Sequence, residues 1–273
     1  MAQRMLPITF LSDYGHEDDF VGVCHGVIQR IAPSAVVIDI VHALPPHDTR
    51  TAALVLRNTL RYMPNGVHLA IVDPGVGTER RAVALRSADG RLFVGPDNGL
   101  LSLAFEQSGG VESAVDLSES SYRLEPFSAT FHGRDLFAPV AAQLALGAEL
   151  DQVGTAFRPE ELVRVELPEV AVSAGEVDAR ALYIDRFGNV QLNATAADMR
   201  AAGLEPGSQL RVNARETPHE ANYVRTFADA PWRALLVYVD SYEAITLAVN
   251  GGSAAAALSL TAGTSVTLSQ NRR

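Results

Sequence analysis

The chain has 273 residues, of which 47% are hydrophobic, and its 22 basic and 32 acidic residues give a formal net charge of −10. This length allows one large domain or two, and the acidic balance argues against a nucleic-acid partner, which requires clustered lysines and arginines. The single cysteine, Cys24, excludes an intrachain disulfide and a multi-cysteine metal site.

The N-terminal stretch MAQRMLPITFLSD lacks the apolar core and cleavage site of a signal peptide. No run approaches the roughly 18 apolar residues that a membrane span requires. We therefore expect a cytoplasmic protein without a membrane partner.

The first seventy residues alternate between strand and helix patterns. The apolar runs at 8–11 (ITFL), 36–41 (VVIDIV) and 67–73 (VHLAIVD) are typical of buried strands. Between these runs, residues 20–31 have apolar side chains at helical spacing, and residues 49–63 predict a second helix. This order predicts parallel strands with helices on the faces of the sheet.

Shorter elements follow in the N-terminal half. AVALRS at 82–87 and RLFVG at 91–95, which flank an Asp-Gly pair, predict a hairpin inserted into the parallel sheet. PDNGLLSLAFEQ, from residue 96, and HGRDLFAPVAAQLALG, from residue 132, each predict a further helix. The first part of the chain is therefore expected to be an α/β domain.

The composition changes from about Arg158 onward. Two prolines, several charges and no sustained period indicate a linker between domains. We predict an α/β domain over residues 1–160, a linker over 161–174 and an all-β domain over 175–273. The strands expected in the last domain are 179–185, 189–193, 208–213, 233–240, 244–250 and 264–270.

Several polar residues directly follow the predicted parallel strands. Asp13 follows the first strand, His42 the second and Asp73 the third. Ligands of open α/β sheets gather at the carboxyl ends of the strands, so these positions are candidate site residues. The glycines and proline of DPGVG, residues 73–77, allow the backbone to approach a small molecule. Neither a Walker A loop nor GxGxxG is present, so this loop is not an ordinary phosphate cradle.

Taken singly, these residues also have structural explanations. Asp73 could cap a turn beside two solvated arginines, and Asp13 could form an Asx turn. Asp18 or Asp19 could cap the following helix, and His132 could be a surface histidine at a helix start.

Six motifs nevertheless occur in a recognisable order: SDYG followed by DD, VDPGVGTERR, PDNGLL, TFHGRD, IDRFGNV and TFADA. Together they resemble the S-adenosylmethionine hydroxide adenosyltransferases, relatives of the fluorinating and chlorinating enzymes that use the same substrate. The resemblance spans nearly the whole chain. It implies a Rossmann-like N-terminal domain, a small C-terminal β-barrel, and a homotrimer whose active sites lie between the N-domain of one subunit and the C-domain of its neighbour.

The resemblance implies hydrolysis of S-adenosyl-L-methionine to adenosine and L-methionine. Hydrolysing members of the family carry an Asp, Arg, His set that matches Asp73, Arg80 and His132. The sulfonium is already a good leaving group, so the enzyme must align a water with the C5′–S bond and help to remove its proton. We expect no metal and no cofactor. Whether Asp73 or His132 accepts the proton stays open.

The resemblance also implies substrate-binding positions. Asp13 matches a carboxylate that accepts both ribose hydroxyls, while Asp18 and Asp185 match positions near the methionine amino group. The remaining matched positions, which line the adenine and methionine ends, are Phe187, Asn189, Phe227, Ser241 and Asn250. Ordinary core packing is the alternative explanation for the two phenylalanines.

Three residues depart from the halogenating relatives. His47 stands where they have a tryptophan over the ribose, and Tyr242 stands where they place an arginine for the methionine carboxylate. Gly133 replaces the halide-binding serine of the fluorinating enzymes, as in the chlorinating enzymes. A slow chloride-dependent activity therefore stays open, although the Asp73 carboxylate would repel a halide.

Two other functions are also consistent with the sequence. One is a noncatalytic protein that binds adenosine or S-adenosylmethionine without turnover. The other is a metal-dependent nucleotide hydrolase, in which carboxylates and imidazoles near the first two strands bind a divalent ion. The candidate ligands for that ion are Asp13, Asp18, Asp19, His16, His42 and His47.

Overall fold

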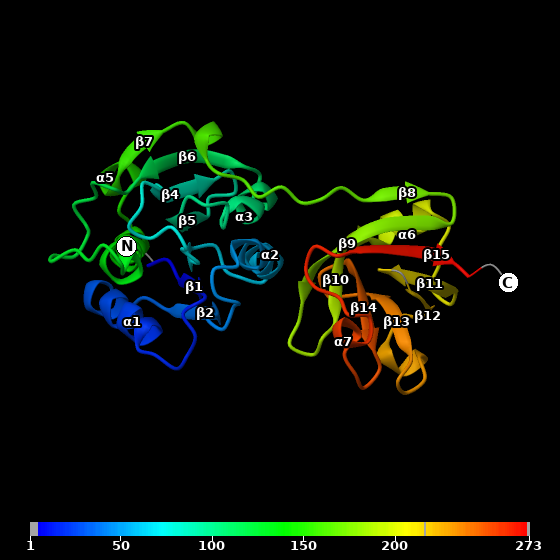
Figure 1. The fold of residues 1–273 in the computed structure, drawn as a ribbon. Coiled ribbons are helices and arrows are strands. Elements are labelled where there is room, and N and C mark those ends of the chain that lie inside the picture. The colour runs from blue at the N-terminus through cyan, green and yellow to red at the C-terminus, as the bar shows by residue number, and fades with distance from the viewer. Residues whose placement is uncertain (1–4, 216, 272–273) are drawn as a thin grey trace. The chain divides into compact units, whose positions relative to one another are not determined.

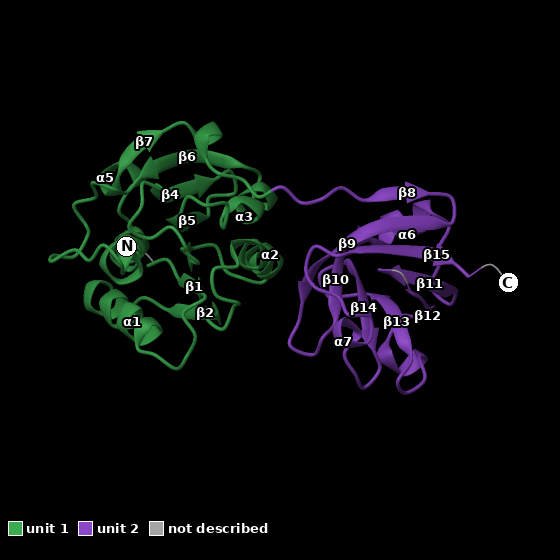
Figure 2. Ribbon diagram, in the orientation of Figure 1, with its two compact units in different colours: residues 1–165 green, residues 166–273 purple. Residues whose placement is uncertain are grey.

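The computed structural model describes residues 5–215 and 217–271, and the chain divides into two compact units, 1–165 and 166–273 (Figures 1 and 2). The division falls inside the range 161–174 predicted as a linker, which also contains the short strand β8 (Ala171–Ser173). None of the helices in the described ranges is both long enough and apolar enough to cross a membrane. The cytoplasmic location stays a prediction.

The first unit contains a mixed sheet with the strand order β2-β1-β3-β5-β4-β6-β7. The parallel part comprises β2 (Val37–Val41), β1 (Ile8–Ser12), β3 (Val67–Ile71) and β5 (Leu92–Pro96). The antiparallel part comprises β4 (Ala82–Ser87), β6 (Val111–Asp116) and β7 (Thr155–Phe157). The predicted hairpin is confirmed as β4 and β5, and it ends the parallel part because β4 reverses direction.

Helices cover both faces of this sheet. Side chains of successive strand residues point to opposite faces, so Phe10 packs in one apolar core and Leu11 in the other. The Phe10 core is covered by α1 (Phe20–Ile31) and α4 (Ala138–Ala145), whereas the Leu11 core is covered by α2 (Thr49–Leu60) and α3 (Ser102–Gln107). A π-helical turn, η1 (Gly133–Phe137), precedes α4, and the short elements α5 (Leu150–Val153) and η2 (Pro159–Glu161) follow it.

The second unit is a closed β-barrel, which confirms the all-β expectation for this part of the chain. Antiparallel pairing of β9 with β10 closes the ring, while β8 extends the edge of β9. The barrel strands are β9 (Glu176–Ile184), β10 (Val190–Thr195), β14 (Ala244–Val249), β13 (Leu235–Val239), β12 (Thr217–Tyr223), β11 (Gln209–Ala214) and β15 (Ser265–Gln270). The short helices are α6 (Ala196–Ala201), η3 (Phe227–Asp229) and α7 (Ala254–Ala257).

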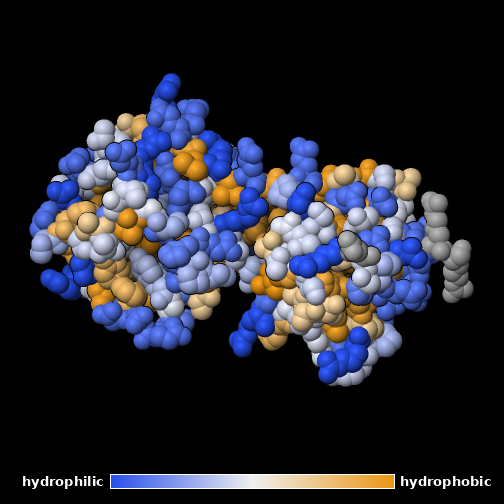
Figure 3. Space-filling view, in the orientation of Figure 1, coloured by the Kyte–Doolittle hydropathy of each residue, from blue (hydrophilic) through white to orange (hydrophobic). Residues whose placement is uncertain are grey.

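The face drawn in Figure 3 is mainly hydrophilic, and its hydrophobic residues form small separate patches. Three large aromatic side chains of the second unit are nevertheless exposed: Phe187 and Trp232 in loops, and Phe227 at the start of η3. Phe187 and Phe227 are candidate site residues. Because Phe187 is 69% exposed, ordinary core packing does not explain it.

Candidate active site

A cavity of about 270 Å³ lies in the first unit, beside the carboxyl ends of β1, β2 and β3. Because these strands are parallel, the residues that follow them meet at one edge of the sheet. The start of α1 and the segment leading into η1 complete the wall. The lining residues are Asp13, Tyr14, Phe20, Pro46, His47, Asp73, Val76, Thr130, Phe131, His132 and Gly133.

The DPGVG loop after β3 turns back on itself. The backbone N–H and the hydroxyl of Thr78 both donate to the carbonyl oxygen of Gly75, at 3.1 and 2.6 Å. Gly77 has a positive φ of 76°, and a Cβ there would lie 2.7 Å from the carbonyl oxygen of Ala129. These tight turns return the chain so that Arg80 lies beside the earlier carboxylate.

Arg80 joins the predicted catalytic residues. Its Nε donates to Asp73 Oδ1 at 2.8 Å, and its Nη2 donates both to Asp73 Oδ2 and to His132 Nδ1, the latter at 3.0 Å. The Asp73 and Arg80 side chains are only 7% and 11% exposed. Such a two-pronged contact between a guanidinium and a carboxylate is both strong and directional. The structure therefore brings Asp73, Arg80 and His132 together at the cavity, while their catalytic roles stay predictions.

The contact with Arg80 defines the protonation of His132. A guanidinium can only donate, so Nδ1 accepts the hydrogen bond and the ring carries its hydrogen on Nε2. Burial lowers the pKa of His132, as does the positive charge of Arg80, against the opposing effects of Asp73 and Asp135. At neutral pH His132 is therefore an uncharged imidazole with one N–H donor.

The second arginine of the motif has a structural contact instead. Arg81 Nε donates to Asp97 Oδ2 at 3.1 Å, its Nη2 donates to the carbonyl oxygen of Glu161 at 2.7 Å, and its guanidinium lies over the Phe157 ring. The two arginines are therefore not solvated charges, because each has its own carboxylate partner.

Tyr14 is a cavity residue to which the sequence analysis assigned no role. Its ring packs against Phe20 and Phe131, with centroids 5.6 and 5.9 Å away, and a Cβ on Gly133 would lie 2.1 Å from its hydroxyl oxygen. Burial raises the pKa of Tyr14 well above its usual value, and the Cys24 thiol and nearby carboxylates add to this shift. No residue in the described ranges forms a hydrogen bond with this hydroxyl. The position of Tyr14 in SDYG, beside Asp13, was the available signal.

Asp13 also lies in the wall of the cavity. Its Oδ2 accepts the backbone N–H of His47 at 2.9 Å, which joins the loops that follow β1 and β2. His47, which stands where the halogenating relatives are expected to have a tryptophan, itself lines the cavity. Asp18, in contrast, is exposed in the bend before α1 and is not among the lining residues.

In the second unit, three predicted site residues form the turn between β9 and β10. Asp185 Oδ1 accepts the backbone N–H groups of Phe187 and Asn189 at 2.8 and 2.9 Å. Its other oxygen accepts the Asn189 side-chain amide at 2.7 Å. The Asp185 carboxylate therefore shapes the turn that carries the exposed Phe187.

Two further predicted residues, Phe227 and Asn250, meet in the segment after β12. The Asn250 side-chain amide donates to the carbonyl oxygens of Phe227 and Ala230, at 3.1 and 2.9 Å. The Phe227 ring packs against Tyr238 at 5.2 Å. Ser241 lies in the exposed turn between β13 and β14. Asn250 therefore holds the loop that presents Phe227.

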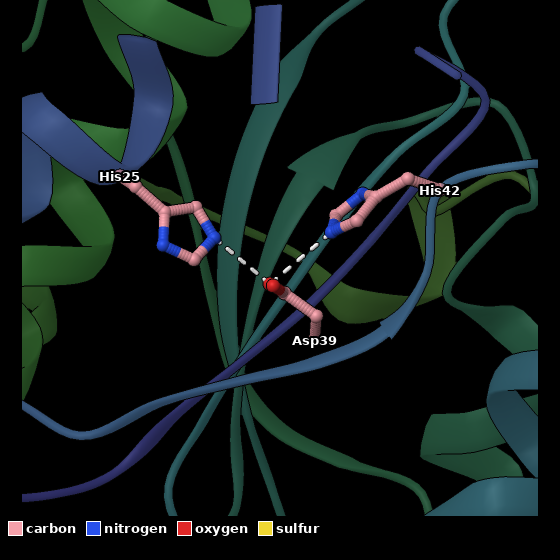
Figure 4. Close-up of side chains that lie close together, drawn as sticks. All are labelled: His25, Asp39 and His42. Atoms are coloured by element: carbon pink, nitrogen blue, oxygen red, sulfur yellow. Dashed lines mark hydrogen bonds and ion pairs between the residues drawn. The ribbon is translucent and has the colours of Figure 1, made fainter. Parts of the chain in front are cut away.

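The ligand set of the predicted metal-dependent hydrolase does not assemble. Within the described ranges, the histidine, cysteine and acidic residues close enough to share an ion are His25, Asp39 and His42 (Figure 4). Of these, His42 alone belongs to the predicted set. The other members of that set form no such group: Asp13, Asp18, Asp19, His16 and His47.

Comparisons with known proteins identify relatives over most of the chain. Residues 8–154 match the family model described as SAM hydroxide adenosyltransferase N-terminal domain, and residues 179–267 match its C-terminal domain. A protein named (R)-S-adenosyl-L-methionine hydrolase from Salinispora arenicola is 51% identical over 94% of this chain and 95% of its own length. A protein named fluorinase from an Actinoplanes species is 31% identical, covering 96% of this chain and 97% of its own length. An uncharacterized conserved protein of Thermotoga maritima has a solved structure with a TM-score of 0.91 and 34% identity, covering 96% of this chain and all of its own.

Proposed function

The chain belongs to the SAM hydroxide adenosyltransferase family, and from this membership we propose that it hydrolyses S-adenosyl-L-methionine to adenosine and L-methionine. One observation carries the proposal: Arg80 links Asp73 and His132 in the wall of a cavity. The name of the Salinispora relative, a hydrolase of the same compound, supports it.

The proposed reaction is a nucleophilic substitution at C5′ of the ribose. The water oxygen forms a bond to C5′ as the C5′–S bond breaks, and that electron pair stays on sulfur to give neutral methionine. One proton leaves the water. Because the sulfonium departs without protonation, catalysis consists of aligning the water and receiving this proton. Neither a metal nor a cofactor takes part.

Asp73 is the proposed proton acceptor. The only lone pair of the neutral His132 ring, on Nδ1, already accepts a hydrogen bond from Arg80. The remaining ring N–H and the Tyr14 hydroxyl are then donors that can hold the water oxygen. A carboxylate in the wall also opposes entry of a halide ion, so water is the favoured nucleophile.

The same proposal assigns the binding of the substrate. The first unit serves as a Rossmann-like platform, in which Asp13 accepts the ribose hydroxyls at the end of β1. Asp18 and Asp185 lie near the methionine ammonium, and Phe187 and Phe227 flank the adenine. Polar contacts to the adenine and methionine ends come from Asn189, Ser241 and Asn250.

We further propose a homotrimer in which the second-unit residues complete the cavity of a neighbouring subunit. A mixture of two variants, Asp73→Ala and Phe227→Ala, each first shown to be inactive alone, tests this arrangement. Random exchange of subunits would restore about a quarter of the wild-type sites, since each site needs one intact contribution from each of two chains. No restored activity in a mixture that sedimentation shows to be exchanged trimers would exclude shared sites.

The activity itself is tested with ¹⁸O-labelled water and a chelator. Purified protein is incubated with S-adenosylmethionine, with and without chloride, and products are separated and weighed by mass spectrometry. Adenosine carrying one ¹⁸O at its 5′-hydroxyl, formed in both conditions, is the expected result. Tight binding without turnover would indicate the noncatalytic alternative, and product that appears only after a divalent ion is added would indicate the metallohydrolase.

A further inference from the structure

His25, Asp39 and His42 converge outside the cavity. Asp39 lies on β2, His42 directly follows that strand, and His25 lies on α1 (Figure 4). Asp39 Oδ1 is 2.9 Å from His25 Nε2 and 3.1 Å from His42 Nε2, and the three ligand atoms all lie within 4.8 Å of one another. The Phe10 ring contacts both imidazoles, with centroids 5.9 and 4.6 Å away, so one side of the cluster is apolar.

The buried nitrogen of His42 lacks a hydrogen bond. His42 is 1% exposed, and its Nδ1 is hydrogen-bonded to Ser12 Oγ at 2.7 Å. Its Nε2 has no hydrogen-bond partner in the described part of the chain, although it points into the cluster and lies close to Asp39. This nitrogen has the Asp39 carboxylate 3.1 Å away but no aligned hydrogen bond, which is unfavourable for a buried polar group, so a ligand along its lone pair would be stabilising.

We propose that His25, Asp39 and His42 bind a zinc ion. Zinc binds imidazole nitrogen and carboxylate oxygen at about 2.0–2.2 Å in tetrahedral geometry, which places neighbouring ligand atoms roughly 3.3 Å apart. The 2.9 and 3.1 Å separations of Asp39 Oδ1 from the two imidazole nitrogens need only a small expansion to reach this value, and the two nitrogens lie within 4.8 Å of each other. In such a site the ion lies along the nitrogen lone pair rather than on the line to the carboxylate oxygen. It can therefore satisfy Nε2 where Asp39 does not.

The surroundings of His42 also suit a metal ligand. With zinc bound, its Nδ1–H donates to Ser12, an outer contact that orients the ring and selects the tautomer. The three protein ligands leave the fourth tetrahedral position for water.

The zinc would stabilise the loops behind the cavity without contacting the substrate. It would tie α1 to the end of β2, where the carbonyl oxygen of His42 accepts the backbone N–H of Gly15 at 2.7 Å. Gly15 directly follows the cavity residues Asp13 and Tyr14. The zinc would not contact the substrate, so this inference does not depend on the proposed hydrolysis.

The test measures metal binding to the full chain. Protein freed of metal by a chelator and dialysed is titrated with Zn²⁺ by calorimetry, and with Co²⁺ by visible absorption, which reports tetrahedral coordination. We expect one zinc per chain and an intense tetrahedral cobalt spectrum. His25→Gln and Asp39→Asn change partly exposed residues, so both variants should fold, and each should weaken zinc binding at least roughly tenfold.

His219→Gln is the matched control, because His219 lies on β12 in the other unit. This variant should bind zinc as tightly as the wild-type protein does. The proposal is overturned if wild-type protein binds no zinc in the micromolar range or gives no cobalt spectrum. It is also overturned if His25→Gln and Asp39→Asn bind zinc as tightly as the control. Hydrolysis of S-adenosylmethionine by the metal-free protein is measured in a separate assay. The zinc proposal and the hydrolysis proposal can therefore fail independently.

Discussion

The Tyr14 hydroxyl occupies the space in the cavity wall that a side chain at Gly133 would need, since a methyl group on Gly133 would lie 2.1 Å from the tyrosine hydroxyl oxygen. The two residues are far apart in the sequence, and they meet because one follows β1 while the other begins η1. The absence of a side chain at residue 133 therefore allows a phenol to reach the place where the nucleophile is proposed to bind.

Gly133→Ala should displace Tyr14 and lower kcat/KM at least tenfold, because separations this short force movement of the ring. Adding Tyr14→Phe removes the hydroxyl oxygen and leaves the ring carbon at 3.1 Å, so the double variant should lose less than the two single losses combined. Steady-state kinetics of the four proteins measures this coupling. Gly26→Ala, on an exposed helical glycine with open space around it, is the control. If the losses of kcat/KM in the two single variants simply added in the double variant, the steric conflict between residues 14 and 133 would be contradicted.

Asp73→Asn should lower kcat by about 100-fold or more while substrate affinity changes little, because the amide keeps the shape but cannot accept the proton. Single-turnover rates and calorimetric binding separate these effects. Asp97→Asn is the matched control, since it removes the carboxylate beside the neighbouring Arg81. That control should keep kcat and lower the free energy of unfolding by roughly 1–3 kcal/mol. Equal loss of kcat in both variants would show that Asp73 acts only through the fold.

Asp13→Ala should raise the dissociation constant for adenosine by about 10- to 100-fold, because two hydrogen bonds from hydroxyls to a carboxylate are lost. The turnover rate at saturating substrate should fall much less. Calorimetry with adenosine and initial-rate kinetics give the two quantities. Asp151→Ala, which removes an exposed carboxylate in α5, should change neither. Unchanged adenosine binding in Asp13→Ala would remove its assigned role.

Acid should destabilise the protein through His68. Burial, with a contribution from the positive charge of Arg91, lowers the pKa of His68 to about 3. In the unfolded chain the histidine has a pKa near 6.5 and binds a proton that the folded chain does not bind. The free energy of unfolding therefore decreases as the pH falls below about 6.5. The expected slope is about 1.4 kcal/mol per pH unit between these values.

Urea unfolding at pH 7 and pH 4.5 measures this loss. The wild-type protein and the His219→Gln control should lose about 2–3 kcal/mol more than His68→Gln, which has no buried imidazole to protonate. Parallel losses in all three proteins would assign the acid sensitivity to other groups.

Local patterns in the sequence determined most of the first unit. The predicted helix at 20–31 matches α1, and the strands predicted at 8–11 and 36–41 match β1 and β2 to within one residue. β1 is fully buried and α1 buries Cys24, Val27 and Ile28 at helical spacing, so the patterns of these two elements can be read from neighbouring residues. β2, in contrast, is an edge strand that is only half-buried, not the buried strand expected at 36–41. The strand β12 was missed because it contains Pro218 and its buried residues are only Ala221 and Tyr223.

The motifs alone likewise indicated the candidate catalytic residues, since DPGVGTERR and TFHGRD carry Asp73, Arg80 and His132. Which groups touch was decided by the tertiary structure. Parallel pairing of β1 with both β2 and β3 brings their following loops to one edge, and packing of α1 on that sheet places His25 over Asp39. These contacts depend on strand order and register between distant segments, and a local hydrophobic period contains no information about either.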